Sequence, residues 1–283
     1  MKSLKDCFKL SNAVEIPCIG FGTFQVPDGD ECVNATICAI EVGYRHIDTA
    51  QGYQNEEGVG TAVKRCGVPR NELFITTKLT NKIRGYDETI AAFEESMKKL
   101  DMDYLDLFLI HWPNPVYFRD CWQEANANTW RAFEYLYDQK RIRSIGISNF
   151  LPYHINELLK TADVSPQVNQ IRLCPGDTQD ETVDYCRSKN ILLQAYSPFG
   201  TGLIFDIPEM KELADKYGKS IAQICIRWCL QREYLPLPKS VSPVRIKENA
   251  DVFNFELVES DVQKIADMKG IIGFSKDPDT TPF

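Results

Sequence analysis

Short apolar runs alternate along the chain with longer segments in which apolar residues recur at every third or fourth position. The short runs are typical of buried strands, and the longer spacing is typical of helices that bury one face. A hairpin within residues 8–16, turning at Ser11 and Asn12, is expected before them. The strands are predicted at residues 19–21, 46–48, 73–78, 104–111, 142–148, 167–170, 192–197 and 235–239.

Helical segments are predicted between these strands, with the clearest spacing at residues 90–100 and 221–229. Ser242 followed by Pro243 suits a helix start, and the glycines at positions 67, 218 and 270 suit helix ends. Roughly eight strand and helix units over about 250 residues are what a TIM barrel requires. No linker or low-complexity stretch divides the chain, so the pattern predicts an α/β fold with one (β/α)8 barrel domain over residues 1–283.

The composition is that of a folded globular chain, with 43% hydrophobic and 25% charged residues. A net charge of −8 argues against a nucleic-acid partner, which would require clustered Lys and Arg over a broad face. No stretch approaches the ~20 apolar residues of a membrane span, and the first residues lack the apolar core of a signal peptide. We therefore expect a cytoplasmic protein with no membrane partner.

The chain has ten cysteines, and no pair has the C-x-x-C spacing of a zinc knuckle or a redox motif. Cys225 and Cys229 are four residues apart on an expected buried helix, where packing as small apolar side chains is favoured over metal ligation. We expect reduced thiols and no structural metal site.

Polar residues that can take part in chemistry end or follow the expected strands. Asp48, Lys78 and His111 end three of them, and Tyr53 lies shortly after Asp48. In a TIM barrel the active site lies at the C-terminal ends of the strands, so these side chains would meet there although they are far apart in the sequence. Further candidates at strand ends are Ser148, Asn149, Gln170, Tyr196, Ser197 and Lys239.

The first four residues fit acid-assisted carbonyl reduction, which needs a hydride on carbon and a proton on oxygen. Tyr53 could give the proton if its pKa is brought from about 10 toward neutrality, and the ammonium of Lys78 would lower that pKa by stabilising the phenolate. Asp48 would keep Lys78 charged and in place. His111 would hydrogen-bond the carbonyl oxygen and orient it.

Each of these residues also has a structural interpretation. Tyr53 could be a loop tyrosine that shields the core, and Lys78 could be a solvated charge at a strand end. His111 could be a hydrogen-bonded structural histidine, and Asp48 could cap the following turn. For each residue singly the structural interpretation is favoured, whereas the occurrence of all four at matched strand ends favours a shared site.

Short motifs extend from residue 20 to residue 249. They read GFGT at 20–23, GYRHIDTA at 43–50 with Tyr53, Asn55 and Glu56, TKL at 77–79, DYLDL at 103–107, HWP at 111–113, IGISNF at 145–150, VNQ at 168–170, YSP at 196–198, and LPKSV at 237–241 with Arg245, Glu248 and Asn249. In this order they resemble the aldo-keto reductase family, in particular bacterial and protist members such as the diketogluconate and glyoxal reductases. The resemblance implies NADPH-dependent reduction of aldehydes and ketones, and it places the family's catalytic tetrad on Asp48, Tyr53, Lys78 and His111.

The resemblance also implies which residues bind NADPH or NADP+. Ser148, Asn149 and Gln170 match the positions that hold the nicotinamide carboxamide, and Tyr196 matches the ring that stacks on the nicotinamide. Arg245 suits a 2′-phosphate, because a guanidinium binds phosphate oxygens in a fork, so NADPH is expected over NADH. The basic residues Lys239, Arg245 and Lys247 form a local cluster, which could equally be an ordinary solvated helix face. The expected cofactor contacts are Gly22, Thr23, Phe24, Asp48, Ser148, Asn149, Gln170, Tyr196, Ser197, Lys239, Ser240, Val241, Arg245, Glu248 and Asn249.

The expected partner is a small carbonyl compound, and a monomer is the family default. The positions that match the family's substrate pocket are Phe24, Tyr53, His111 and Trp112. The loop at residues 114–128 is expected to hang over this pocket, although its Trp122 could also belong to the core.

The chain departs from the family pattern after residue 170. Arg172 and Cys174 stand in a segment where the family commonly has an acidic residue followed by His-Pro. Arg172 could alter the electrostatics beside the cofactor or lie on the surface. The connection at residues 199–207 is short, as in the bacterial and protist members.

Three other functions have some support in the sequence. Tyr185 and Lys189 have the Tyr-x-x-x-Lys spacing of a short-chain dehydrogenase, but the glycine fingerprint of that fold is missing, and the two residues fit one face of an ordinary helix. A barrel aldolase could use Lys78 or Lys239 as a Schiff-base amine. A regulatory nucleotide-binding module with little turnover is the alternative that is not an enzyme.

Overall fold

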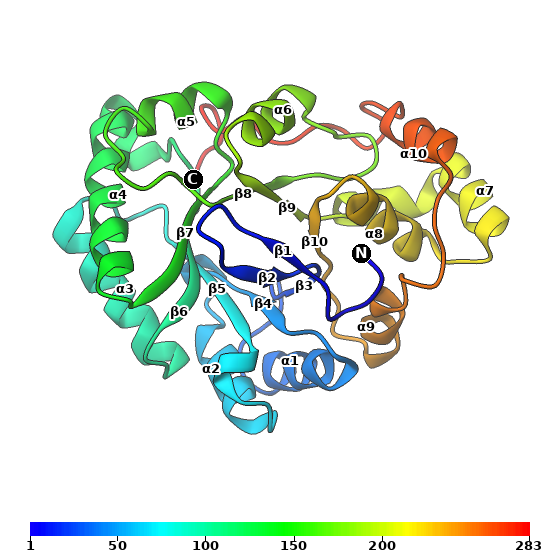
Figure 1. Ribbon diagram of the computed structural model, residues 1–283, viewed down its shortest axis with the longest axis horizontal. Coiled ribbons are helices and arrows are strands. Elements are labelled where there is room, and N and C mark those ends of the chain that lie inside the picture. Colours follow the sequence, from blue (N-terminus) through cyan, green and yellow to red (C-terminus); the bar gives the residue numbers. More distant parts are fainter.

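The computed structural model describes residues 1–283, and its centre is a ring of eight parallel strands surrounded by helices (Figure 1). Neighbours in the ring follow the order of the chain. The ring closes where the backbone N–H of Gly22 donates to the carbonyl of Pro238 at 3.0 Å. The strands are β3 (Gly20–Gly22), β4 (His46–Asp48), β5 (Phe74–Leu79), β6 (Leu105–Ile110), β7 (Ile142–Ser148), β8 (Val168–Arg172), β9 (Leu192–Tyr196) and β10 (Leu235–Leu237).

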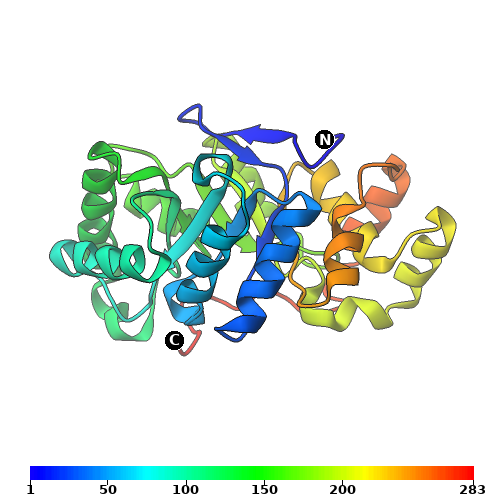
Figure 2. The same cartoon turned by 90° about the horizontal axis from the view of Figure 1, so that it is seen from below.

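The N-terminal hairpin covers one end of the barrel, and the C-terminus lies at the other (Figure 2). It consists of β1 (Cys7–Lys9) and β2 (Glu15–Pro17), which pair antiparallel with Phe8 opposite Ile16. Ile16 is fully buried and packs with inward side chains of the barrel strands, among them Leu107 and Leu235. The hairpin therefore closes the N-terminal end and leaves the C-terminal end open to ligands.

The helices pack around the strands with one apolar face each, as their spacing predicts. The helical bounds are α1 (Asp30–Val42), η1 (Gln51–Tyr53), α2 (Glu56–Arg65), η2 (Arg70–Glu72), α3 (Tyr86–Leu100), η3 (Val116–Cys121), α4 (Trp122–Asp138), α5 (Pro152–Leu158), α6 (Asp180–Ser188), η4 (Gly200–Asp206), α7 (Pro208–Tyr217), α8 (Ile221–Gln231), α9 (Pro243–Ala250) and α10 (Glu259–Ala266), where η marks a 3₁₀ helix. None of them is both long and apolar enough to span a bilayer.

The predicted barrel and hairpin are confirmed, with strand ends that differ from the predictions by one or two residues. One of the differences is in β10, which ends at Leu237, two residues before the predicted end, because Pro238 has no N–H to donate to a neighbouring strand. Ser242 precedes α9 as predicted, but its side chain makes no capping hydrogen bond. Gly218 ends α7 with a φ of 60°, whereas Gly270 lies beyond α10 and does not cap it.

The expectation of a loop at residues 114–128 is wrong for most of that segment. It contains η3 and the first turns of α4, so only its beginning is irregular. Trp122 begins α4 and packs edge-on against His154 at a ring distance of 4.9 Å. Cys225 and Cys229 are fully buried in α8, and Lys189 lies over the ring of Tyr185 at the end of α6, so both pairs belong to ordinary helices.

Candidate active site

The C-terminal ends of β4, β5 and β6 bring the four candidate residues together. Asp48 is the last residue of β4, Lys78 is the last but one of β5, and His111 follows β6 directly. Tyr53 ends the short helix η1, which returns the chain over the strand ends. Residues from separate parts of the sequence therefore share one site, as predicted from the strand ends.

Lys78 is the centre of this cluster. Its Nζ donates to Asp48 Oδ1 at 2.6 Å, to the backbone carbonyl of Thr49 at 2.9 Å and to Tyr53 Oη at 3.2 Å. The Lys78 side chain is fully buried, and that of Asp48 is only 4% exposed. The ammonium has three acceptors for its three hydrogens, so its position is fixed from all sides.

The pKa of Tyr53 is shifted in the opposite direction to the one we expected. Burial and the Asp48 carboxylate raise the pKa of Tyr53 well above its ordinary value, although Lys78 lies within hydrogen-bond distance. The positive charge of Lys78 is balanced by Asp48, so it does not outweigh the cost of placing a phenolate in a buried site. The phenol is therefore protonated at neutral pH, as a proton donor must be.

Lys78 and His111 are also shifted by burial. Burial lowers the pKa of Lys78 below its ordinary value, and the Asp48 carboxylate opposes this shift. Burial, with the charges of Lys78 and Arg84, lowers the pKa of His111 to about 3. The imidazole is thus neutral at neutral pH, and its ring makes no hydrogen bond within the protein, so one N–H is available to a ligand. Its centroid lies 5.8 Å from that of Tyr53.

A second set of hydrogen bonds joins the ends of β7, β8 and β9. Ser148 Oγ donates to the backbone carbonyl of Gln170 at 2.7 Å, and Asn149 Nδ2 donates to Ser148 Oγ at 3.1 Å. Tyr196 Oη donates to Asn149 Oδ1 at 2.8 Å. Gln170 Nε2 donates to Asp48 Oδ2 at 2.7 Å and so links this set to the lysine cluster. Asn149 and Ser197 adopt left-handed backbone conformations, with φ of 62° and 49°, at the turns that follow the strands.

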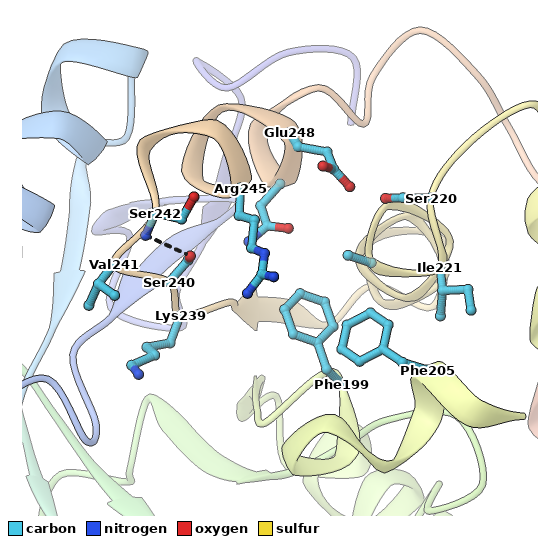
Figure 3. A pocket seen from close by; sticks show the side chains of 12 residues that line it. Phe199, Phe205, Ser220, Ile221, Lys239, Ser240, Val241, Ser242, Arg245 and Glu248 are labelled. Atoms are coloured by element: carbon cyan, nitrogen blue, oxygen red, sulfur yellow. Dashed lines mark hydrogen bonds between the residues drawn. The ribbon is translucent and has the colours of Figure 1, made fainter.

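A cavity of about 490 Å³ lies beside β10 and the start of α9 (Figure 3). Arg245 reaches from α9 toward the rings of Phe199 and Phe205, which come from the connection after β9 (Figure 3). The cavity thus combines two basic side chains, Arg245 and Lys239, with an aromatic wall. Its lining residues are Phe199, Phe205, Ser220, Ile221, Ala222, Lys239, Ser240, Val241, Ser242, Arg245, Glu248 and Asn249.

Aromatic side chains surround Tyr53 and His111 at the open end of the barrel. The Phe24 ring is 50% exposed, and its centroid lies 5.0 Å from that of Tyr53. Trp112 is mostly covered, and its ring meets Phe283 edge-on at 4.8 Å. Phe283 therefore lies beside Trp112, one of the residues expected to line the substrate pocket.

The sequence model described as the Aldo/keto reductase family matches residues 18–269. The chain belongs to this family. Over 263 residues it is 48% identical to the glyoxal reductase of Bacillus subtilis, and the alignment covers 93% of this chain and 92% of the B. subtilis protein.

Solved structures of other aldo/keto reductases agree in fold. An aldo/keto reductase from Brucella melitensis superimposes with a TM-score of 0.89 at 42% identity, covering 95% of this chain and 99% of that one. The Bombyx mori aldo-keto reductase in complex with NADP superimposes with a TM-score of 0.87 at 34% identity, covering 100% of this chain and 98% of that one.

The segment in which this aldo/keto reductase departs from the family pattern ties down the C-terminal region. Arg172 Nη1 lies 2.8 Å from Asp177 Oδ2 and also donates to the carbonyl of Gly273 at 3.1 Å. The Arg172 side chain is only 11% exposed, and its charge opposes the rise in the pKa of Tyr196 that burial causes. Cys174 is fully buried and pairs by backbone hydrogen bonds with Asp177.

The sequence did not predict Phe199, Phe205 or Phe283 as residues of the site. The two phenylalanines of the cavity wall follow the Tyr-Ser-Pro motif, and an aromatic pair in that short connection was a signal that could have been used. Phe283 reaches Trp112 only because the tail folds back over the barrel, for which the sequence offers no spacing rule.

Proposed function

We propose that this aldo/keto reductase reduces aldehydes and ketones to alcohols with NADPH, and that Tyr53 supplies the proton. The proposal rests mainly on one observation, the hydrogen bond from the buried Lys78 ammonium to the hydroxyl of Tyr53. A protonated phenol beside a fixed ammonium can lose its proton to a substrate oxygen, because the ammonium stabilises the phenolate that remains.

The residues present fit the proposed cofactor at both of its ends. Ser148, Asn149 and Gln170 cluster at the strand ends beside Lys78, and the side-chain carbonyl of Gln170 accepts no hydrogen bond from the protein. Arg245 and Lys239 line the cavity at the start of α9, where they suit the 2′-phosphate of NADPH. When bound, the reduced nicotinamide would supply the hydride.

Each catalytic residue has one task in the proposed reaction. As the hydride reaches the carbonyl carbon, Tyr53 Oη gives its proton to the carbonyl oxygen, which becomes the hydroxyl of the alcohol. Lys78 donates to the phenolate oxygen, and Asp48 balances the charge of Lys78. His111, neutral in this site, donates its N–H to the carbonyl oxygen and orients it.

The remaining contacts are proposed from position. Phe24 and Trp112 would line the pocket for the carbonyl compound, and Tyr196 would stack on the nicotinamide. We further propose a single-domain, monomeric, cytoplasmic enzyme without nucleic-acid or membrane partners, which agrees with the net charge of −8. The other cofactor contacts that we propose are Gly22, Thr23, Phe24, Ser197, Ser240, Val241, Glu248 and Asn249.

Oxidation of NADPH on addition of a reactive aldehyde tests the function. We expect steady loss of the absorbance of the reduced nicotinamide, and no loss without the aldehyde. Tight NADPH binding with no turnover for any carbonyl compound would contradict the reductase and favour the regulatory nucleotide-binding module. Trapping of a covalent adduct by borohydride in the absence of cofactor would favour the Schiff-base aldolase.

A further inference from the structure

Gln194 lies in the barrel interior next to Gln170, and the proposed reaction assigns it no role. It is fully buried on β9 and stands opposite Gln170 of β8 in the parallel register. The Nε2 of Gln170 donates one hydrogen to Asp48 Oδ2 at 2.7 Å and the other to Gln194 Oε1 at 2.8 Å. Both hydrogens of the Gln170 amide are therefore taken within the protein.

The direction of these hydrogen bonds follows from Asp48. Its carboxylate is ion-paired with Lys78, so it can only accept. Gln170 must turn its nitrogen toward Asp48, and Gln194 must then present its oxygen to the second N–H of Gln170. The reverse orientation of the Gln170 amide would place two acceptors, its own oxygen and Asp48 Oδ2, against each other.

Two atoms are left without partners in the protein. The Oε1 of Gln170 accepts no hydrogen bond and, since Gln170 remains 2% exposed at the open end of the barrel, is available to a ligand. The Nε2 of Gln194 is enclosed and has no partner. Buried polar groups nearly always have partners. The unpaired N–H of Gln194 in the interior therefore indicates that its side-chain oxygen is needed there as the acceptor for Gln170.

We propose that Gln194 is a positioning residue for the nicotinamide carboxamide. By holding the second hydrogen of the Gln170 amide, it keeps Gln170 Oε1 turned toward the cleft, where it accepts a hydrogen bond from a carboxamide N–H. Gln194 does not touch the cofactor itself. This inference rests on the proposed function, because it requires that the chain binds a nicotinamide nucleotide at this site.

The position of Tyr196 supports the same role for β9. Tyr196 follows Gln194 by two residues, so both side chains lie on the same face of the strand. One residue would stack on the nicotinamide ring and the other would fix the acceptor for its carboxamide. The single strand β9 would thus control both the plane of the ring and its rotation within that plane.

Binding of NADP+ and of its 3-acetylpyridine analogue tests the proposal without turnover. In the analogue a methyl group replaces the carboxamide NH₂, so the hydrogen bond to Gln170 is lost. By calorimetric titration, wild type should bind NADP+ about tenfold more tightly than the analogue, as expected for one buried hydrogen bond. Gln194→Met, which removes the acceptor at similar volume, should bind the two nucleotides about equally.

Two further variants distinguish the proposed positioning role of Gln194 from a general effect of removing a buried glutamine. Gln194→Glu keeps an acceptor for Gln170 and should retain the preference for NADP+. Gln167→Met removes a buried glutamine whose side chain contacts only the backbone of Ile145 and Ser165, and it should also retain the preference. If Gln194→Met does not fold, Gln194→Asn replaces it, because the shorter amide stays polar but cannot reach Gln170.

Each result that would contradict the proposal has its own meaning. A folded Gln194→Met or Gln194→Asn with the wild-type preference would overturn the proposal, and so would a Gln194→Glu variant without it. Equal affinity of wild type for the two nucleotides would show that Gln170 Oε1 is not an acceptor and would also overturn it. Failure of wild type to bind either nucleotide would overturn the proposal through the proposed function itself.

Discussion

Lys78 is the residue through which the charges of the site are balanced. Its ammonium contacts both the Asp48 carboxylate and the Tyr53 hydroxyl, and the ion pair is almost fully enclosed. Removing one partner of a buried ion pair typically costs about 3–5 kcal/mol, because the other charge is left without compensation. Substitutions of Lys78 or Asp48 therefore affect folding as well as chemistry, whereas a substitution of the Tyr53 hydroxyl leaves the pair intact.

The pKa shifts predict the pH dependence of reduction. Burial lowers the pKa of Lys78, so the rate at saturating substrates should fall with rising pH at a value below the ordinary pKa of lysine. Tyr53 stays protonated over this range because its pKa is raised. His111, with a pKa of about 3, should produce no acidic limb between about pH 5 and 7. The measurement is kcat as a function of pH.

An acidic limb near the ordinary pKa of histidine that disappears in His111→Gln would contradict this prediction. It would show that His111 is exposed enough to be protonated near neutrality. The hydrogen bond to the carbonyl oxygen would then come from an imidazolium and not from a neutral imidazole.

Arg245 is the residue that should distinguish the two nicotinamide nucleotides. Arg245→Ala should weaken NADPH binding by about ten- to hundredfold, as expected for lost hydrogen bonds between charged groups, with little change for NADH. Lys247→Ala is the matched control, since Lys247 lies on the same helix but does not line the cavity. Dissociation constants from fluorescence titration decide the matter, and equal losses for both nucleotides would refute the contact with the 2′-phosphate.

At the scale of elements, the residues that strands and helices hold in place were the ones best predicted from the sequence. Asp48, Ser148 and Tyr196 end their strands, and the periodicity of short apolar runs located those ends within one or two residues. The pKa of Tyr53 was not predicted correctly, because it depends on the depth of burial and on how Asp48 offsets Lys78. Neither quantity can be obtained from sequence spacing.

The C-terminal tail, residues 277–283, is fastened to the barrel mainly through Asp279. Its Oδ1 accepts from Asn114 Nδ2 at 2.8 Å and lies 3.1 Å from His154 Nε2, and its Oδ2 accepts from the hydroxyl of Tyr153. His154 Nδ1 accepts from a backbone N–H, so its Nε2 carries the hydrogen that Asp279 receives. Arg119 Nη2 also donates to the carbonyl of Thr281 at 2.8 Å, so Asp279 and Arg119 together hold the segment that places Phe283 against Trp112.

Asp279→Ala should loosen this tail and let Phe283 move away from Trp112. We expect KM for small apolar aldehydes to rise by about three- to tenfold, because one or two apolar contacts are lost, while kcat and the affinity for NADPH stay near wild type. Asp215→Ala, which removes an exposed carboxylate on α7, serves as the control. Unchanged KM values across aldehydes of different size would show that the tail is not part of the pocket.

At the scale of the whole molecule, buried neutral histidines make stability depend on pH. Burial lowers the pKa of both His46 and His111 to about 3, whereas an unfolded chain titrates near the ordinary value of about 6.5. The unfolded state therefore binds more protons in that range, and the stability present above about pH 6.5 is lost as the pH falls. The loss by pH 5 should be about 2 kcal/mol for each histidine.

Urea unfolding at neutral pH and near pH 5 measures this loss. His46→Gln should show a smaller drop in unfolding free energy between the two pH values than wild type, because one buried histidine no longer titrates in the unfolded state. The His46 ring bonds to Thr76 and makes no hydrogen bond to the four residues proposed to be catalytic, so the substitution should leave these residues in place. An equal drop in unfolding free energy in the variant and in wild type would indicate that His46 does not cause the pH-dependent loss of stability.

The barrel as a whole explains why residues from distant parts of the sequence form one site. Parallel strands in chain order place all their C-terminal ends at one end of the ring, while the hairpin closes the other end. This arrangement was predictable from the alternation of apolar patterns. The aromatic contacts from Phe199, Phe205 and Phe283 were not, because they depend on how irregular segments fold back over the strands.

Single-turnover reduction of an aldehyde by Tyr53→Phe, with NADPH bound beforehand, tests the central claim most directly. Loss of the hydroxyl should slow the reaction by about a hundredfold or more, the usual contribution of a positioned proton donor, while NADPH affinity stays at the wild-type value. A variant that binds NADPH and still reduces the aldehyde at close to the wild-type rate would show that the proton comes from another group.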